Sequence, residues 1–184
     1  DYFYRRFGRR GLDDRNLPIV SIVHPLARSD TPIYSSDTVG TWINNASYLG
    51  DGFIVYGDGD GRVFNYLSGA LDVVGHELTH GVTDYSSQLE YRDESGALNE
   101  AFSDIMGTGI EFFFERSGKG PQRGPNWLIG EDVTRASPGF IRSLQNPSAT
   151  GNPDHYSLRQ LIGTTSDLSR IHISEPTRRR GISY

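Results

Sequence analysis

Two of the five histidines lie four residues apart, in the segment His76-Glu77-Leu78-Thr79-His80. Residues i and i+4 share one face of an α-helix, so both imidazoles can reach a single metal ion. Glu77 lies one step round the helix, where it can take a proton from a water molecule at an open position of the ion. The alternative is a pair of ordinary surface histidines, because a five-residue match also arises by chance.

A catalytic zinc ion needs a third protein ligand. Glu100 offers one, and Asp104 follows it by four residues on the same predicted helical face. Asp104 is therefore placed to accept the second N–H of a ligating histidine and to fix its orientation. The alternative is a solvated acidic stripe. The turn 84–96 favours the metal site, because it allows the two helical faces to meet at one point.

The elements that carry these residues follow from the spacing of apolar side chains. A helix is predicted from Ser68 onward, with Leu71, Val74, Leu78 and Val82 at helical spacing. A second helix is predicted over 97–116, with Leu98, Phe102, Ile105, Ile110 and Phe113 on its apolar side. Upstream, residues 2–7 favour a short helix, 19–23 a strand, 32–56 strands and turns, and 57–61 a loop.

The predicted fold class is therefore α+β. We divide the chain into a strand-rich part (1–67), a part with the active-site helices and their loops (68–167), and a tail (168–184).

Composition limits the classes of function. The chain has 184 residues, of which 35% are apolar and 22 are glycine, enough for a globular core. No apolar run approaches the roughly 18 residues of a membrane span. The absence of cysteine excludes a disulfide scaffold and a thiol nucleophile. A net charge of −5 argues against nucleic acid or a membrane surface as a partner. We expect a monomer.

The motifs together resemble a known family. The segments Gly75–Tyr85 (GHELTHGVTDY) and Gly96–Asp104 (GALNEAFSD) are similar to those of thermolysin-like neutral metalloproteases, peptidase family M4. The stretches YGDGDG (56–61), GED (130–132) and PDHY (153–156) match that family too, so that the resemblance covers about residues 1–165.

The resemblance implies a catalytic apparatus. His76, His80 and Glu100 would be ligands of Zn²⁺, and Glu77 would be the general base of peptide hydrolysis. Tyr91 would donate a hydrogen bond to the developing oxyanion. By the same resemblance, the protein is expected to be a secreted metalloendopeptidase.

The resemblance also implies how a peptide or protein substrate would bind. Asn45 and Ala46 match an edge strand that holds the peptide backbone, and Arg142 would grip the carbonyl beyond the cut. Five apolar residues match the pocket for the side chain after the cut, which predicts a hydrophobic preference there: Phe64, Val73, Ile129, Val133 and Ile141. The segment 45–48 lacks the family's two large aromatic residues and is followed by about one extra residue before Tyr56, so its register is open.

Calcium is the second metal that the resemblance implies. Asp72, Glu111 and Glu131 match family carboxylates that bind Ca²⁺, an ion that prefers oxygen ligands. Asn126 and Leu128 stand where the most calcium-rich members have acidic residues, so we expect one ion.

The resemblance weakens toward the end of the chain. Family members extend beyond both ends of this sequence, and a large part of their helical domain is expected to be missing. His172 and Asp167 superficially match a family pair that stabilises the transition state, but the residues after His172 do not match. The tail 168–184 is therefore assigned to a non-family, artefactual origin. Two alternatives stay open: a fragment that binds zinc without turnover, and a different zinc hydrolase such as an aminopeptidase.

Overall fold

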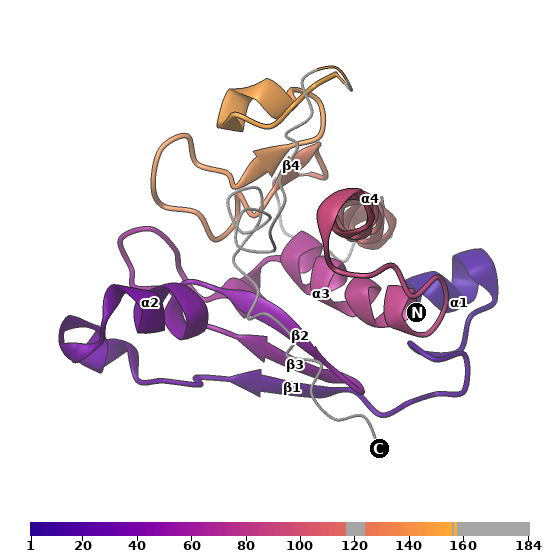
Figure 1. Cartoon of the computed structure of the whole chain (residues 1–184), viewed down its shortest axis with the longest axis horizontal. Helices are drawn as coiled ribbons and strands as arrows, with labels where there is room; N and C mark the ends of the chain where they lie inside the picture. Colours follow the sequence, from indigo (N-terminus) through magenta and orange to yellow (C-terminus); the bar gives the residue numbers. More distant parts are fainter. Residues whose placement is uncertain (117–123, 156, 158–184) are drawn as a thin grey trace.

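The computed structural model describes residues 1–116, 124–155 and 157. The tail 168–184 lies outside the described residues, as do Asp167 and His172, so the predictions made for them stay predictions. The described part combines helices and strands, as the α+β assignment predicts (Figure 1).

A three-stranded sheet forms the base of the molecule (Figure 1). Its order is β1 (Val20–Val23), β3 (Phe53–Tyr56) and β2 (Ala46–Gly50), with β1 parallel and β2 antiparallel to β3. The turn 50–52 joins β2 to β3, and all three of its residues have positive φ, which suits its two glycines. One edge of β2 has no partner among the described strands.

Two long helices, α3 (Leu71–Asp84) and α4 (Asp93–Arg116), pack on each other next to the sheet (Figure 1). Two glycines permit the close approach. A Cβ atom on Gly107 would lie 2.4 Å from the carbonyl oxygen of Asp72, and one on Gly75 would lie 2.9 Å from Ile110 Cδ1. The backbones of α3 and α4 therefore come closer than residues with side chains would allow.

Both predicted helices exist, with shifted starts. A 3-10 turn, η3 (Leu67–Gly69), and an extended Ala70 precede α3, so the helix begins at Leu71 instead of Ser68. The helix α4 begins at Asp93 instead of residue 97, since Asp93 and Glu94 in the first turn interact favourably with the helix dipole. Of the other predicted elements, the helix at 2–7, the strand near 19–23 and the loop at 57–61 are confirmed.

The apolar core lies between the sheet and α3. It comprises Ala46, Ile54, Tyr56, Leu67, Ala70, Val73 and Val133. Yet α3 also buries polar side chains, because His76, Glu77, Thr79 and His80 are each at most 5% exposed. Burying so many polar groups costs free energy unless they have partners, which marks α3 as the helix that carries the site.

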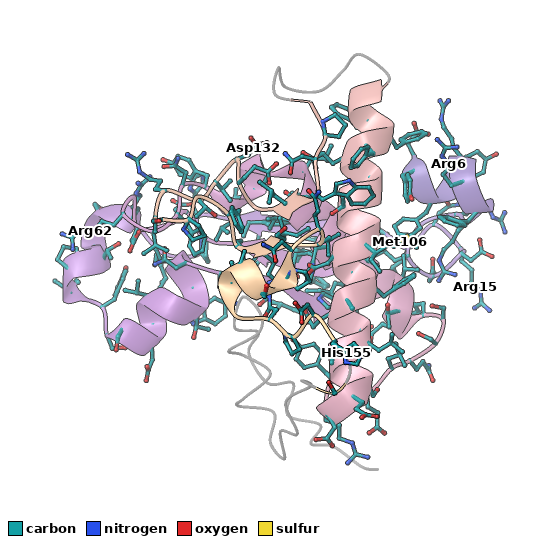
Figure 2. The ribbon with its side chains drawn as sticks, turned by 90° about the horizontal axis from the view of Figure 1, so that it is seen from above. Arg6, Arg15, Arg62, Met106, Asp132 and His155 are labelled. Atoms are coloured by element: carbon teal, nitrogen blue, oxygen red, sulfur yellow. The ribbon has the colours of Figure 1, made fainter. Side chains whose placement is uncertain are left out.

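The remaining elements surround this centre. The helix α1 (Tyr2–Phe7) lies beside α4 (Figure 2). The ring of Tyr2 packs edge-on against Phe113 of α4. The short helix α2 (Ser36–Thr38) continues into a π-helical turn, η2 (Val39–Ile43), and a 3-10 turn, η1 (Arg28–Ile33), precedes them. A two-stranded ribbon of β4 (Leu128–Ile129) and β5 (Arg142–Ser143) lies above α3, followed by the turn η4 (Pro147–Thr150). No helix in the described part of the chain has the length and hydropathy that crossing a bilayer requires.

Candidate metal centre and active site

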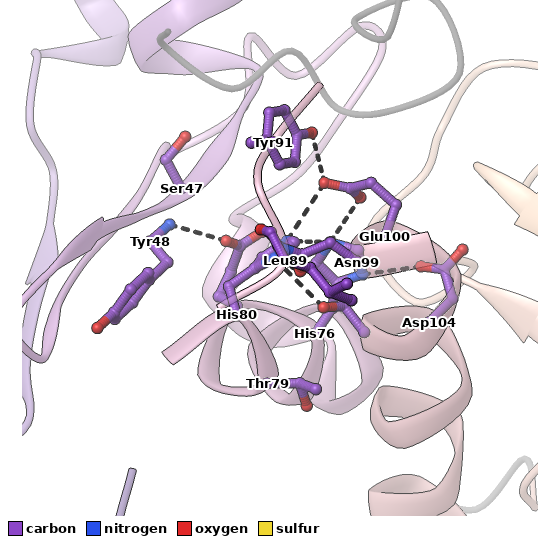
Figure 3. A network of polar contacts seen from close by, with 12 residues as sticks. Ser47, Tyr48, His76, Thr79, His80, Leu89, Tyr91, Asn99, Glu100 and Asp104 are labelled. Atoms are coloured by element: carbon purple, nitrogen blue, oxygen red, sulfur yellow. Dashed lines mark hydrogen bonds and ion pairs between the residues drawn. The ribbon is translucent and has the colours of Figure 1, made fainter. Parts of the chain in front are cut away.

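Three side chains converge where α3 meets α4 (Figure 3). The Nε2 atoms of His76 and His80 lie 2.9 Å apart. Glu100 Oε2 lies 3.2 Å from His76 Nε2, and Glu100 Oε1 lies 3.4 Å from His80 Nε2. All three side chains are buried. The two helices thus bring together the three residues that the sequence predicts as zinc ligands.

These distances fit a tetrahedral metal ion. Zinc bonds of about 2.0–2.1 Å to nitrogen and oxygen place tetrahedral ligand atoms roughly 3.3 Å apart. The observed separations of 2.9, 3.2 and 3.4 Å lie on both sides of that value. Two nitrogens and one carboxylate also form a donor set that catalytic zinc sites use, with a fourth position left for water or substrate.

The outer nitrogens of both imidazoles face acceptor oxygens on α4. His76 Nδ1 lies 2.8 Å from Asp104 Oδ1, and His80 Nδ1 lies 2.9 Å from Asn99 Oδ1 (Figure 3). The amide of Asn99 is oriented by its donor bond to the carbonyl oxygen of Leu89, so its oxygen faces His80. Each Nδ1 therefore carries a proton, and both Nε2 atoms point toward each other and toward Glu100.

Two imidazoles and a carboxylate that face one another at short distance are stabilised by a positive charge between them. Burial opposes protonation of His76, but the charge of Glu100 and the hydrogen bond to Asp104 outweigh it and raise the pKa of His76 to about 9. The site attracts a cation, and a divalent ion satisfies all three groups at once. The residues present fit zinc.

Asp104 has the position predicted for it, and it has a second partner that the sequence did not predict. Arg142 Nε donates to Asp104 Oδ2 at 2.7 Å, and Arg142 Nη2 donates to Asp104 Oδ1 at 2.6 Å. Burial alone would raise the pKa of Asp104, but the Arg142 charge and the contact with His76 hold it well below its usual range. Asp104 is therefore ionised while it accepts from His76.

Glu77 lies beside this centre and is anchored by the sheet. The backbone N–H of Tyr48, in the edge strand β2, donates to Glu77 Oε2 at 2.8 Å (Figure 3). Glu77 is 1% exposed. Burial and the charge of Glu77 both raise the pKa of the neighbouring Tyr56 above its usual range, so that this phenol stays neutral. The carboxylate of Glu77 thus has a fixed orientation next to the histidines.

Tyr91 reaches the same centre from the turn between the helices. Its hydroxyl donates to Glu100 Oε1, and its ring lies edge-on to His80 with 6.2 Å between centroids (Figure 3). Tyr91 thus lies beside the three predicted zinc ligands, and its oxyanion role stays a prediction.

Asn45 and Ala46, which we predict to hold a substrate, lie at the start of the edge strand β2. Asn45 immediately precedes β2, is buried and donates through Nδ2 to Ser47 Oγ at 3.2 Å. Ala46 pairs with Tyr56. The register shifts between Tyr48 and Gly50, which marks a bulge or irregularity in β2.

The five predicted pocket residues lie next to the core and to the β4–β5 ribbon. Val73 and Val133 belong to the core cluster, and Phe64 packs against it. Ile129 is buried, and its carbonyl oxygen accepts from the N–H of Ile141 at 2.8 Å. Ile129 also pairs with Arg142, so the ribbon links the apolar residues to the ion pair with Asp104.

The calcium site predicted at Asp72, Glu111 and Glu131 stays a prediction. Among the described residues, the one group of three or more metal-binding side chains with ligand atoms within 4.8 Å of one another is His76, His80 and Glu100. Asp72 Oδ2 accepts from the N–H of Gly130, and Glu131 Oε1 accepts from Asn126 at 2.6 Å. Burial, opposed by the Gly130 bond and assisted by the charge of Glu131, raises the pKa of Asp72 to about 6.

Sequence reasoning missed Asn99, the partner of His80. The available signal was its position next to Glu100, on the helix that already supplied Asp104 as the partner of the other histidine.

Comparisons with known proteins agree with this centre. A model of the thermolysin metallopeptidase catalytic domain matches residues 1–84, and one of the alpha-helical domain of the same family matches residues 87–176. The second match includes residues 168–176, which we assigned to the tail, so the boundary of that tail stays a prediction.

Several proteins are similar to most of this chain. A bacillolysin of Bacillus cereus is 45% identical over 94% of this chain and 26% of its own length. A thermolysin of Alicyclobacillus acidocaldarius subsp. acidocaldarius is 45% identical over 94% of this chain and 28% of its length. An extracellular elastase of Staphylococcus epidermidis is 41% identical over 94% of this chain and 30% of its length.

A solved structure shows the same fold. The precursor of protealysin, a metalloproteinase from Serratia proteamaculans, matches with a TM-score of 0.62 and 35% identity, over 78% of this chain and 39% of that chain. This chain thus spans less than a third of the length of these three curated relatives. With both family models matched along it and the His-His-Glu centre in place, the chain belongs to the thermolysin family of metallopeptidases.

Proposed function

We propose that this chain carries the catalytic centre of a zinc-dependent endopeptidase. The observation that carries the proposal is the convergence of His76, His80 and Glu100, with both histidine Nδ1 protons already directed to oxygens of α4. A zinc ion held there would supply Lewis-acid polarisation of a peptide carbonyl and of the attacking water.

Two residues of the chain would move or stabilise charge. Glu77 is the general base, which accepts a proton from the attacking water and later passes it to the leaving amine. The N–H of Tyr48 keeps its carboxylate oriented for both steps. Tyr91 would turn its hydroxyl from Glu100 to the developing oxyanion, where one such donor lowers the barrier by a few kcal/mol.

The substrate would bind as an added strand along the open edge of β2. Asn45 would contact its backbone, and Arg142 would donate to the carbonyl beyond the cut. In the proposed pocket, the five apolar residues Phe64, Val73, Ile129, Val133 and Ile141 would prefer a hydrophobic side chain, by roughly 1–3 kcal/mol for a methylene-sized difference.

The test separates metal binding from turnover. Glu77→Gln removes the base while keeping the size of the side chain, so this variant should bind one equivalent of zinc and lose cleavage of casein. Glu90→Gln is the matched control, because Glu90 is exposed and pairs with Arg92 outside the centre. Casein cleavage by Glu77→Gln at the wild-type rate would show that Glu77 is not the base.

A second candidate function is zinc binding without catalysis. It is favoured because this chain covers only a small part of the length of its relatives. At 26–30% of their length, the chain would bind zinc without turnover if the missing part forms a wall of the active site. Casein cleavage should be compared between this chain and a version completed with a helical domain from a relative. Cleavage by the completed version alone would establish this alternative.

We also propose one calcium ion near Asp72, Glu111 and Glu131. Support comes from the raised pKa of Asp72 and from Glu131 Oε2, which is buried and has no hydrogen-bond partner within the described residues. Calcium should then raise the Tm of the zinc-loaded chain, and Glu131→Gln should reduce that rise. A Tm that does not respond to calcium would contradict this proposal.

Secretion is proposed because one relative is named an extracellular elastase. A monomer is proposed because the net charge of −5 opposes self-association, and light scattering after size-exclusion chromatography tests it.

A further inference from the structure

Arg142 connects the β4–β5 ribbon to the metal ligands. Its Nε and Nη2 atoms donate to the two oxygens of Asp104, and Asp104 Oδ1 faces His76 Nδ1 at 2.8 Å. Arg142 is 5% exposed and Asp104 is 4% exposed. The three side chains therefore form a buried chain of charge-assisted hydrogen bonds that ends at a zinc ligand.

The two bonds from Arg142 fix the plane of the Asp104 carboxylate. A parallel pair of N–H···O bonds holds a carboxylate in one orientation, whereas a single bond allows it to rotate. Orientation matters here, because the carboxylate keeps the proton of His76 on Nδ1 and leaves the Nε2 lone pair for the metal.

The third nitrogen of the guanidinium has a different environment. Arg142 Nη1 is buried and makes no hydrogen bond within the described residues. One side of the guanidinium thus holds Asp104, while a donor remains for a substrate carbonyl. If Arg142 served only to bind the substrate, it would not need two hydrogen bonds to Asp104.

We propose that Arg142 is a positioning residue for zinc, which sets the affinity of the site for the metal through Asp104 and His76. The inference rests on the proposed zinc centre. It makes Arg142 a link between the substrate carbonyl and the metal ligands, so that binding at either end changes the affinity at the other.

Arg142→Lys is the informative substitution. Lysine keeps a positive charge that can reach a substrate carbonyl, but as a point charge it cannot form the paired bonds to Asp104. Outer partners of metal ligands typically contribute 10–100-fold to metal affinity, and Arg142 acts one step further out, so we expect about a tenfold weaker zinc affinity.

The experiment measures the zinc dissociation constant of the full 184-residue chain by competition with a chromophoric chelator. The variants are Arg142→Lys, Asp104→Asn and the double variant. If Arg142 acts through Asp104, the double variant should bind zinc about as weakly as Asp104→Asn alone. Arg135→Lys is the matched control, because the exposed side chain of Arg135 donates only to the Asn65 side chain among the described residues.

The outcomes separate this inference from the proposed function. Wild-type zinc affinity in Arg142→Lys, with only KM raised, would overturn the inference and leave the zinc centre standing. The inference would also be overturned if the losses of zinc affinity in Arg142→Lys and Asp104→Asn added up in the double variant. Wild-type protein that binds no zinc would overturn the proposed function itself. If Arg142→Lys does not fold, the same cycle with Arg142→Gln gives the answer, because glutamine also lacks the paired bonds.

Discussion

The Nε2 atoms of His76 and His80 lie 2.9 Å apart while the Nδ1 atom of each ring faces an oxygen of α4. At this separation the two Nε2 atoms need a cation between them, either a proton on one ring or a metal ion bound by both. The hydrogen bonds to Asp104 and Asn99 therefore prepare the pair for a metal ion before the metal arrives.

Asn99 should contribute to zinc affinity through His80. Asn99→Ala removes the acceptor of the His80 Nδ1 proton and should weaken zinc binding by about 10–100-fold. Asn99→Asp keeps an acceptor oxygen and should restore much of the affinity. Chelator competition measures both variants. If alanine and aspartate weaken zinc binding equally, the hydrogen bond to His80 is not the cause.

Tyr91 should act on turnover more than on substrate binding. Tyr91→Phe removes the hydroxyl and keeps the ring that lies against His80, so kcat should fall by about 100-fold or more while KM changes little. Steady-state kinetics on a chromogenic peptide, at saturating zinc, gives both constants. A raised KM with unchanged kcat would instead place the hydroxyl in ground-state binding.

Gly107 should be needed for the contact between the two active-site helices. A Cβ at this position would lie 2.4 Å from the carbonyl oxygen of Asp72, which cannot move without shifting α3. Gly107→Ala should therefore destabilise the fold by roughly 1–3 kcal/mol, despite the better helix propensity of alanine.

Gly109→Ala is the control for that experiment, because its Cβ would meet only the ring and hydroxyl of Tyr2, on a side chain able to rotate away. Urea denaturation compares the two variants. Equal midpoints for Gly107→Ala and Gly109→Ala would show that the helices do not depend on the close approach.

Asp60 should make the stability of the 57–61 loop depend on pH. Burial would raise the pKa of Asp60, but the N–H groups of Val63 and Arg62 and the amide of Asn44 outweigh it and lower the pKa. The stabilisation is therefore present above the unfolded pKa of about 4 and lost as pH falls through the lower folded value.

Asp60→Asn should accordingly cost about 1 kcal/mol at pH 7, a value reduced for the partial exposure of the carboxylate. The difference from wild type should shrink toward pH 3. Denaturation midpoints across this range measure it. A difference that stays constant with pH would show that the charge of Asp60 is not what the loop requires.

The sequence predicts the centre where the chemistry depends on spacing along one helix. His76, Glu77 and His80 share a turn, and Glu100 and Asp104 share another, so helical periodicity is enough to group them. The turn 84–96 indicates that the two helices meet, and the family resemblance supplies the role of Tyr91.

Contacts that depend on tertiary packing could not be predicted in this way. The hydrogen bond from the Tyr48 N–H to Glu77 depends on how β2 packs on α3. Its donor is a backbone N–H, which nearly every residue type has, so the sequence does not indicate it. The pairing of Arg142 with Asp104 joins segments 38 residues apart, and its geometry depends on the β4–β5 ribbon. The start of α4 was missed because Gly96 and Ser95 read as a turn, whereas the acidic first turn and packing extend the helix.

The proposed activity depends on one metal ion held by two imidazoles and a carboxylate. X-ray absorption at the zinc edge, on the purified chain loaded with zinc, tests it most directly. We predict one zinc per chain, with nitrogen and oxygen ligands at about 2.0–2.1 Å and the scattering signature of two imidazoles, and the loss of that signature in the His76→Ala and His80→Ala variants. A zinc spectrum without imidazole scattering, or one that both variants leave unchanged, would contradict the account.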